Sequence, residues 1–383
     1  MTPLEERVAS GFAERARREP EGLWWAPGRV NLIGEHTDYN DGYVFPFAID
    51  RGTVAAAAGR DDGRLRLWSL DADAVGDVGV RELAPGRVEG WTAYPQGIAW
   101  ALREAEVAVP GADVLVATSL PQGSGLSSSA ALLCAVGLAL VELADATLTA
   151  RELALLAQRA ETEVAGVPTG AMDQLASMLG RDGHAIFLDT RTLETEPVRL
   201  AVRDAGLVLL VVDTCVPRRL ADGAYAERRA QCEEAARILG VDALRDATPE
   251  GVVSAEAELG DVLTRRARHV VTEDVRVLEA VDALREREWT RLGALLAASH
   301  ASLRDDYEVS ARALDVAVDA CTDAGALGAR MTGAGFGGCA LALVPAPTTD
   351  AVAAAVADAF ARERLGTPEV FEVAPAAGAR RLR

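Results

Sequence analysis

The sequence predicts an α+β protein with two domains. A chain of 383 residues is long enough for two domains of ordinary size, each with its own core. Turn residues divide residues 23–70 into short apolar runs that are typical of strands, whereas residues 225–320 are mostly helical in pattern. The composition changes near residues 200–210, so we expect domains over residues 1–205 and 206–383.

The first domain begins with a helix and then a series of strands. A helix is expected over residues 4–19, because Leu4, Val8 and Phe12 share one side and Pro20 stops it. Short strands are expected over residues 23–26, 30–33, 43–49, 53–58 and 65–70. The other expected elements are helices over 94–108, 128–143 and 150–165 and from Met172, and strands over 112–118, 184–189 and 196–202.

The second domain opens on a continuous apolar run. Residues 207–212 predict a buried strand, and helical patterns follow through residue 320. The arginine-rich run 265–268 is expected to form a solvated helix face. The chain is then expected to form a strand over residues 340–344, a helix over 350–363 and a strand over 368–373.

Charge and cysteine usage exclude several classes of protein. The chain has 39 basic and 58 acidic residues, a formal net charge of −19, which disfavours nucleic acid and anionic membranes as partners. It has no apolar run of the length that spans a membrane, and residues 1–18 lack the apolar core of a secretion signal, so we expect a cytoplasmic protein. Neither a disulfide framework nor a zinc site is expected from the scattered cysteines Cys134, Cys215, Cys232, Cys321 and Cys339.

The chain contains no lysine. A Walker-type P-loop needs a Lys that reaches the β- and γ-phosphates, and a protein kinase needs a strand Lys of its own. Both designs are therefore excluded. If this chain handles ATP, it must do so with backbone amides, arginine and a metal ion.

The segment 26–40 concentrates polar groups at the end of a predicted strand. Glu35, His36 and Asp38 place three polar side chains within four residues, more than a core can bury unpaired. Short acidic side chains beside a His can hold the adjacent hydroxyls of a sugar. Taken alone, the segment fits a hydrophilic turn with nothing bound equally well.

Three further segments have the composition of ligand loops. Residues 121–129 combine two glycines with three serines at a helix start, where a phosphate can meet free N–H groups and the helix dipole. Residues 166–174 place Asp173 in an apolar frame, and residues 331–339 are rich in glycine. Taken singly, these segments also fit an ordinary turn before a helix, a helix-capping Asp and a tight strand connection.

Together the segments resemble the galactokinase family of the GHMP small-molecule kinases. The run GRVNLIGEHTDYN at residues 28–40 is similar to the family's galactose-binding signature, and it is the specific motif. PQGSGLSSSA at residues 121–130 is similar to the ATP loop, and MTGAGFGGC at residues 331–339 to the third motif, both shared across GHMP kinases. The sequence departs from the family at Ser124 and at residues 131–133, which bears on nucleotide affinity and leaves the chemistry intact.

The resemblance implies a role for individual residues. Asp173 would be the catalytic base and Arg29 its electrostatic partner. Ser129 and Glu161 would bind Mg²⁺. The implied sugar-binding residues are Glu35, His36, Thr37, Asp38, Gly170, Asp173 and Tyr225. The implied ATP-binding residues are Gly123, Ser124, Gly125, Leu126, Ser127, Ser128 and Ser129, with Trp91 and Tyr94 near the adenine; an aromatic core pair explains these last two nearly as well.

The resemblance also implies a fold and an activity. The N-terminal galactose- and ATP-binding domain would resemble the ribosomal protein S5 domain 2 fold, and the C-terminal GHMP kinase domain would be ferredoxin-like, with the site in the cleft between them. The implied reaction is transfer of the γ-phosphoryl group of MgATP to the C1 hydroxyl of galactose by a monomer. Two rival interpretations remain open: a kinase for N-acetylgalactosamine or arabinose, and a non-catalytic sensor of galactose and ATP, against which the intact Asp173, Arg29, Ser129 and Glu161 argue.

Overall fold

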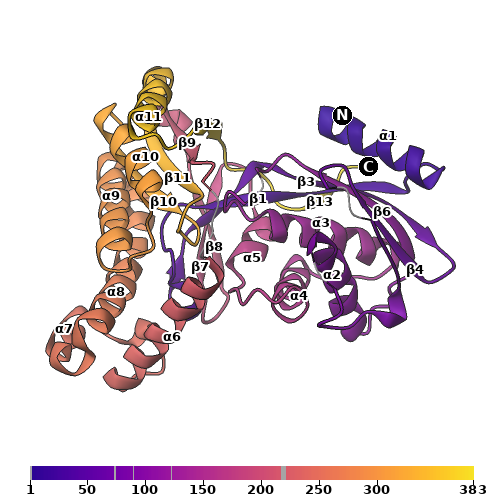
Figure 1. Ribbon diagram of the computed structural model, residues 1–383, viewed down its shortest axis with the longest axis horizontal. Coiled ribbons are helices and arrows are strands. Elements are labelled where there is room, and N and C mark those ends of the chain that lie inside the picture. Colours follow the sequence, from indigo (N-terminus) through magenta and orange to yellow (C-terminus); the bar gives the residue numbers. More distant parts are fainter. Residues whose placement is uncertain (1, 73–74, 89, 122, 217–220) are drawn as a thin grey trace.

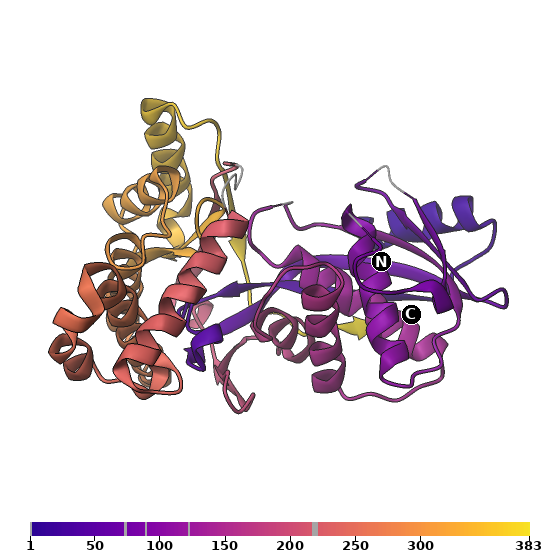
Figure 2. The ribbon, with the colours of Figure 1, turned by 60° about the horizontal axis from the view of Figure 1, so that its bottom comes forward.

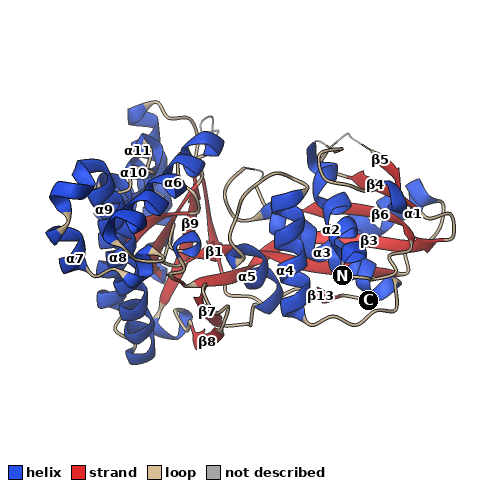
Figure 3. Ribbon diagram, turned by 90° about the horizontal axis from the view of Figure 1, so that it is seen from below, coloured by secondary structure: helices blue, strands red, loops and turns tan. Residues whose placement is uncertain are grey.

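The computed structural model describes residues 2–72, 75–88, 90–121, 123–216 and 221–383. Two parts lie side by side in Figure 1: one is built on a six-stranded sheet, and the other carries most of the later helices around a four-stranded sheet. Figure 3 shows the same separation by colour, with the strands of the larger sheet running through one part and a helix-rich part beside it. The mixed helices and sheets confirm the predicted α+β class.

The six-stranded sheet has the order β13-β1-β3-β6-β4-β5, and its only parallel pair among the described residues is β4 with β6. Alternate residues of β3 point to opposite faces, so that Val54 and Ala56 join a core on one face of the sheet, while Ala55 and Ala57 join a second core on the other face. The strands are β1 (Gly22–Asn31), β3 (Pro46–Arg60), β4 (Arg64–Ser69), β5 (Gly76–Gly79), β6 (Gly111–Thr118) and β13 (Arg380–Arg381).

Helices cover both faces of this sheet (Figure 1). α1 (Pro3–Ala16) lies on one face, and α2 (Ala93–Glu104), α3 (Ser128–Leu143), α4 (Ala150–Glu163) and α5 (Met172–Leu179) lie on the other. Among the described residues, no helix combines the length and the apolar character needed to cross a bilayer. A small sheet joins β2 (Tyr43–Val44), which lies between β1 and β3 in the chain, to β7 (His184–Asp189) and β8 (Thr195–Arg199), which follow α5.

The four-stranded sheet is antiparallel, in the order β10-β11-β9-β12. Its strands are β10 (Gly328–Thr332), β11 (Cys339–Pro345), β9 (Leu207–Asp213) and β12 (Glu369–Val373). Its helices are α6 (Ala221–Leu239), α7 (Pro249–Ser254), α8 (Glu256–Glu286), α9 (Trp289–Asp305), α10 (Arg312–Asp323) and α11 (Thr349–Glu363). β9 is buried on both faces: Leu210 packs with the helices, while Leu209 packs with Phe45 and Phe47 of the other part. This second contact joins the two parts through one core; the boundary at residues 205 and 206 stays a prediction.

The last residues of the chain return to the first sheet. β13 pairs with β1, and in two views both chain ends lie on the part built around the six-stranded sheet (Figure 1, Figure 2). On the way, the N–H groups of Gly378 and Ala379 donate to the carbonyls of Gly180 and Ser177, at 2.7 and 2.9 Å. The C-terminal segment therefore holds the C-terminal end of α5 against the sheet.

Three features differ from the sequence prediction. β1 and β3 are each one strand where two were expected, because they pair with each other on both sides of an irregularity at residues 27–29, and β3 runs on through the polar residues 50–52. β5, β10 and β13 were not expected. The prediction of a solvated face over 265–268 is wrong for Arg266, which is 2 % exposed and forms an ion pair with Glu308 while donating to the carbonyl of Asp306.

Candidate active site

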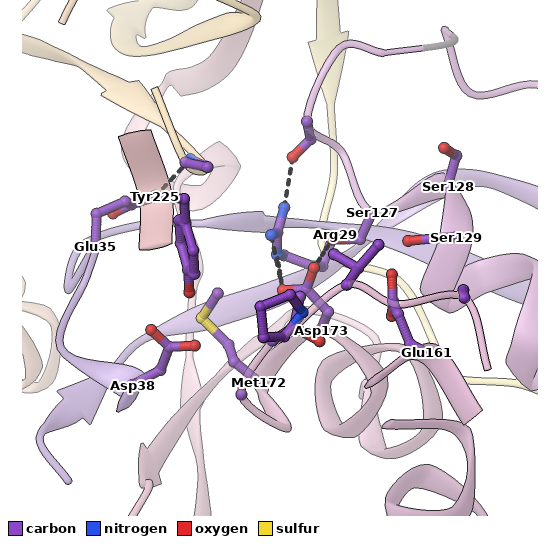
Figure 4. Close-up of a pocket in the computed structure, with 18 of the residues that line it drawn as sticks. Arg29, Glu35, Asp38, Ser127, Ser128, Ser129, Glu161, Met172, Asp173 and Tyr225 are labelled. Carbon is purple, nitrogen blue, oxygen red and sulfur yellow. Dashed lines mark hydrogen bonds and ion pairs between the residues drawn. The ribbon is translucent and has the colours of Figure 1, made fainter. Parts of the chain in front are cut away.

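A cavity of about 700 Å³ lies where the four predicted ligand segments meet. Figure 4 shows Arg29 and Asp173 at its centre, with Asp38, Glu35 and Tyr225 on one side and Ser128, Ser129 and Glu161 on the other. The predicted site residues that line it are Arg29, Glu35, His36, Asp38, Tyr94, Gly123, Gly125, Ser127, Ser128, Ser129, Glu161, Gly170, Asp173 and Tyr225. The structure thus brings together residues that are far apart in the sequence, from Arg29 of the first motif to Ala334 of the last.

Asp173 and Arg29 form the central ion pair. Asp173 lies in the first turn of α5, and Arg29 lies on β1 just after an irregularity in its pairing with β3. The guanidinium Nε and Nη2 lie 2.8 and 2.7 Å from Oδ1 of Asp173. Gly28 brings the strand close to the loop, since a Cβ there would lie 2.5 Å from the carbonyl oxygen of Leu126.

The loop before α3 is a sharply turned segment that ends at the helix start. Gly123 and Gly125 have positive φ (72° and 85°), and Ser127 precedes the helix in the left-handed region at φ 57°. The first N–H groups of α3 have no partner within the helix, so this end favours an anion. Ser124 instead turns its hydroxyl to the carbonyl of Pro121 at 2.8 Å, and Leu126 is buried in the core; Gln122 lies outside the described residues.

Glu161 of α4 is a buried carboxylate beside Ser129. It hydrogen-bonds with Ser129, and it accepts from Nε2 of Gln174 at 2.5 Å. Burial raises the pKa of this carboxyl to about 7, helped by the nearby charge of Asp173 and opposed by the hydrogen bond from Ser129. A carboxylate and a hydroxyl side by side are oxygen ligands of the kind that Mg²⁺ prefers, and a cation there would offset the burial of the charge.

Asp38 faces Asp173 across the cavity. It begins the short 3₁₀ turn η1 (Asp38–Asn40) and lies so close to Gly170 that a Cβ at position 170 would stand 2.4 Å from its Oδ2. Burial raises the pKa of Asp38 to about 6, and the charge of Asp173 adds to this, while Arg29 opposes it. Two carboxylates that share one cavity with a single arginine between them are suited to a neutral ligand rich in hydroxyl groups.

Glu35 is held by the third motif. Its Oε1 accepts hydrogen bonds from the N–H of Gly333 at 2.8 Å and from Oγ1 of Thr332 at 3.1 Å. The carboxylate also forms an ion pair with Arg330, which is fully buried and lies 3.8 Å from Glu273 of α8. Burial raises the pKa of Glu35, although Arg330 opposes the shift. Glu35 therefore links the first motif to the second sheet as well as lining the cavity.

His36 has both ring nitrogens engaged by the protein. Nε2 lies 3.2 Å from the carbonyl of Ala334, which can only accept, so Nε2 carries the proton and Nδ1 accepts from the hydroxyl of Tyr39 at 2.8 Å. Burial lowers the pKa of His36 to about 3, so the ring is neutral. Its centroid lies 5.7 Å from that of Tyr225. The ring can shape the cavity, but its nitrogens are occupied.

Some predicted residues lie outside the lining of the cavity. Thr37 turns its hydroxyl to the carbonyls of Gly34 and Tyr43, at 2.9 and 2.6 Å, and Trp91 packs partly buried against the first core. Ser124 hydrogen-bonds within its own loop, and Leu126 is buried in the core. Lining residues that were not predicted are Ala165, Gly166, Val167, Pro168, Thr169, Met172, Gly333 and Ala334. The sequence signal was present for all of them except Ala165, since the others lie in the two segments singled out for Asp173 and for the glycine-rich turn.

Comparison with known proteins identifies the family. The galactokinase galactose-binding signature matches residues 10–59, the GHMP kinases N terminal domain matches residues 93–181, and the GHMP kinases C terminal domain matches residues 280–364. Galactokinase of Streptomyces coelicolor is 52% identical over 99% of this chain and 100% of its own length. Galactokinase of Haemophilus influenzae (strain PittEE) is 41% identical over 98% of each chain.

Solved structures give the same result. The crystal structure of Lactococcus lactis galactokinase complexed with galactose superposes with a TM-score of 0.94 at 36% identity, covering 99% of this chain and 100% of that one. The mevalonate kinase of Methanococcus jannaschii superposes with a TM-score of 0.66 at 17% identity over 92% of this chain and 98% of its own, which shows a shared fold. The chain therefore belongs to the galactokinase family of the GHMP kinases.

Proposed function

We propose how the residues of the cavity carry out the galactokinase reaction. In this reaction the chain transfers the γ-phosphoryl group of ATP to the C1 hydroxyl of galactose and gives galactose 1-phosphate and ADP. The acceptor hydroxyl has a high pKa and must be oriented in line with the γ-phosphorus, so the protein has to position it and receive its proton.

Asp173 is the general base in this proposal. The observation that carries it is the ion pair with Arg29, which keeps a carboxylate at the centre of the cavity between the sugar side and the loop side (Figure 4). Arg29 also lies where it can neutralise charge on the equatorial oxygens of the transferred group. General-base catalysis contributes about 10² to 10⁴ in rate, so orientation and electrostatic stabilisation must supply the rest.

The loop and the first turn of α3 would hold the phosphates. Gly123, Gly125 and Ser128 line the cavity beside the helix N-terminus, where backbone N–H groups are free to bind oxygen. Tyr94 also lines the cavity and is our candidate for the adenine neighbour. Trp91 is separated from the cavity lining, which favours its alternative assignment as a core residue.

Ser129 and Glu161 would hold Mg²⁺. They are hydrogen-bonded to each other on the loop side of the cavity, and both offer the oxygen ligands that this ion prefers. When bound, the ion supplies charge neutralisation and orientation for the phosphates. Glu161 is then stabilised as the ionised form, which burial alone disfavours.

Asp38, Gly170, Glu35 and Tyr225 would form the galactose side. Asp38 projects into the cavity opposite Asp173, and Gly170 leaves room for that carboxylate. His36 would contribute the shape of its ring, because both ring nitrogens are already bound. An ionised Asp38 accepts hydrogen bonds from neighbouring hydroxyls, so it would read the stereochemistry of the sugar.

A coupled ADP-release assay over a panel of sugars tests the substrate assignment. We expect turnover with galactose, and kcat/KM for glucose lower by about one to two decades, because one inverted hydroxyl leaves a buried acceptor unpaired. Glucose used as efficiently as galactose would contradict the sugar-reading role of Asp38. Equal use of N-acetylgalactosamine would move the substrate to the rival kinase and leave the roles of Asp173 and the loop in place.

The remaining assignments extend this proposal to the whole chain. We place the chain as a monomer in the cytoplasm, with galactose and ATP as its partners and a domain boundary between residues 205 and 206. Light scattering on the purified protein tests the oligomeric state. A mass above the 40.2 kDa of one chain would overturn that assignment.

A further inference from the structure

Two residues donate hydrogen bonds to the carboxylate of Asp173, and its oxygen Oδ1 receives more of these bonds than Oδ2 does. Oδ1 faces two donors of Arg29, Nε at 2.8 Å and Nη2 at 2.7 Å. Oδ2 accepts from the hydroxyl of Ser127. An ionised carboxylate offers about four lone-pair sites, two on each oxygen. The lone pairs of Oδ1 are therefore both used, and one lone pair of Oδ2 remains.

We propose that Ser127 is a positioning residue that leaves one lone pair of Asp173 Oδ2 as the acceptor of the sugar proton. The inference rests on the proposed role of Asp173 as general base. As the C1 oxygen forms its bond to the γ-phosphorus, its O–H bond breaks and the proton moves to Oδ2. The bond from the γ-phosphorus to the bridging oxygen breaks with it, and ADP leaves with that electron pair.

The backbone around Ser127 holds its hydroxyl in place against Asp173. Ser127 is 7 % exposed and has a φ of 57°, in the left-handed region that serine seldom adopts. The residue directly precedes α3, and its hydroxyl points to α5. The same loop grips Arg29: Nη1 donates to the carbonyl of Gly125 at 2.6 Å, and the backbone N–H donates to that of Leu126 at 3.2 Å. Three consecutive loop residues, 125–127, thus fix both members of the Arg29–Asp173 pair.

This arrangement gives Ser127 a different role from its neighbours Ser128 and Ser129. Those two are half-buried, and Figure 4 shows their hydroxyls away from Asp173, on the loop side. Ser127 reaches the base instead. The sequence predicts all three as ATP-binding residues, so the test must separate a phosphate ligand from a residue that acts through Asp173.

Substitutions at position 127 separate the hydroxyl from the backbone. Ser127→Gly removes the hydroxyl and accepts a positive φ, whereas Ser127→Ala removes the hydroxyl but keeps a Cβ in the left-handed region. We expect both to lower kcat by roughly 10- to 100-fold, the size expected for a hydrogen bond to a charged group. We expect the dissociation constants of ATP and galactose, measured by calorimetry, to stay within about threefold of wild type, because neither ligand is bound through this hydroxyl.

Ser177→Ala is the matched control. Its hydroxyl is also buried and also ties α5 to another segment, here β1, since it donates to the carbonyl of Pro27 at 2.7 Å and not to Asp173. We expect a lower Tm and a kcat within about threefold of wild type. A loss of kcat in Ser177→Ala equal to that in Ser127→Gly would overturn the assignment, because any buried hydroxyl of this region would then suffice.

A double-mutant cycle with Asp173→Asn completes the test. If Ser127 acts through Asp173, adding Ser127→Gly to Asp173→Asn costs less than about threefold in further kcat. Three outcomes would overturn the inference. The double variant could show the full additional loss, Ser127→Gly alone could keep the wild-type kcat, or its ATP dissociation constant could rise by the same factor as its kcat falls. Wild-type turnover in Asp173→Asn would instead overturn the proposed function, so the two failures are distinguishable.

Discussion

The two ends of the cavity treat their polar groups in opposite ways. At the reaction end, Asp173 accepts from three donor groups of two residues, Arg29 and Ser127, and keeps a lone pair open to the cavity. At the junction end, Glu35 and His36 have most of their polar atoms bound by residues 330–334 of the second sheet and the turn after it. A segment rich in polar residues therefore serves two purposes here. Some of its polar groups are open to a ligand, and others are closed, because they are already bound by the protein and join its two parts.

This contrast separates the expected effects of mutation. A change at the reaction end removes chemistry from a fold that does not depend on it. A change at the junction end leaves a charge buried without its partner, so the whole fold is weakened. The four predictions below test this separation, starting with the largest effect.

Asp173→Asn should give the largest loss. The amide keeps the shape of the side chain but cannot take the proton of the acceptor, so we expect kcat to fall by about 10² to 10⁴. Steady-state ADP release measures the rate, and calorimetric titration should show that galactose still binds. Turnover within a factor of about three of wild type would remove the general base from this end of the cavity.

Arg330→Met should act on stability. Arg330 is fully buried, so its removal leaves Glu35 and Glu273 without this cation, and we expect the free energy of unfolding to fall by about 3 to 5 kcal/mol. Urea denaturation measures it. The matched control is Arg312→Met, whose exposed pair with Glu363 should be worth about 0 to 1 kcal/mol. Equal destabilisation by the two substitutions would end the distinction between the ends of the cavity.

Asp38→Ala should change substrate choice more than fold. Asp38 is the open carboxylate of the sugar side, and without it the inverted hydroxyl of glucose is no longer penalised. We expect the ratio of kcat/KM for galactose over glucose to fall by about 10- to 100-fold. Competition between the two sugars in one assay measures the ratio directly. An unchanged ratio would show that another residue reads the stereochemistry.

The pH dependence of galactose use should show the raised pKa of Asp38. Burial and the charge of Asp173 raise this pKa to about 6, so the carboxyl is protonated below that pH and loses its capacity to accept from hydroxyls. Wild-type kcat/KM should therefore fall as the pH falls. Asp38→Asn has no carboxyl to titrate at this position, so between neutral pH and pH 5 the wild type should lose about tenfold more kcat/KM than this variant does. Parallel profiles for the two proteins would contradict the assignment.

The sequence predicts those parts of the fold that carry their own signal. α3 begins at Ser128 and ends at Leu143 as expected, because a serine-rich start precedes a long apolar run. β5, β10 and β13 were not predicted, since segments such as Arg380–Arg381 have no apolar alternation and become strands only through pairing with a neighbour. Arg266 was misjudged for the same reason: Glu308, its partner, is distant in sequence.

The site shows the same division. The motifs and their order point to the residues that meet in the cavity, because each motif is a continuous run. The closed state of His36 could not be predicted, since the group that fixes its tautomer is a backbone carbonyl at Ala334, 298 residues away, and a carbonyl leaves no trace in side-chain chemistry. The Glu35–Arg330 ion pair could not be predicted either, because its two residues are far apart in the sequence. An arginine within a largely apolar segment does, however, indicate a buried partner.

The return of the C-terminal segment to the first sheet imposes an order on biosynthesis. Leu23 of β1 exchanges backbone hydrogen bonds with Leu382 and Arg383, and Arg381 donates to the carbonyl of Glu21 across a separation of 360 residues. While the ribosome is still making the second part, this edge of β1 is unpaired, and an unpaired edge invites pairing with other chains. This edge of β1 therefore stays open to such pairing until β13 has been made, and β13 then closes it.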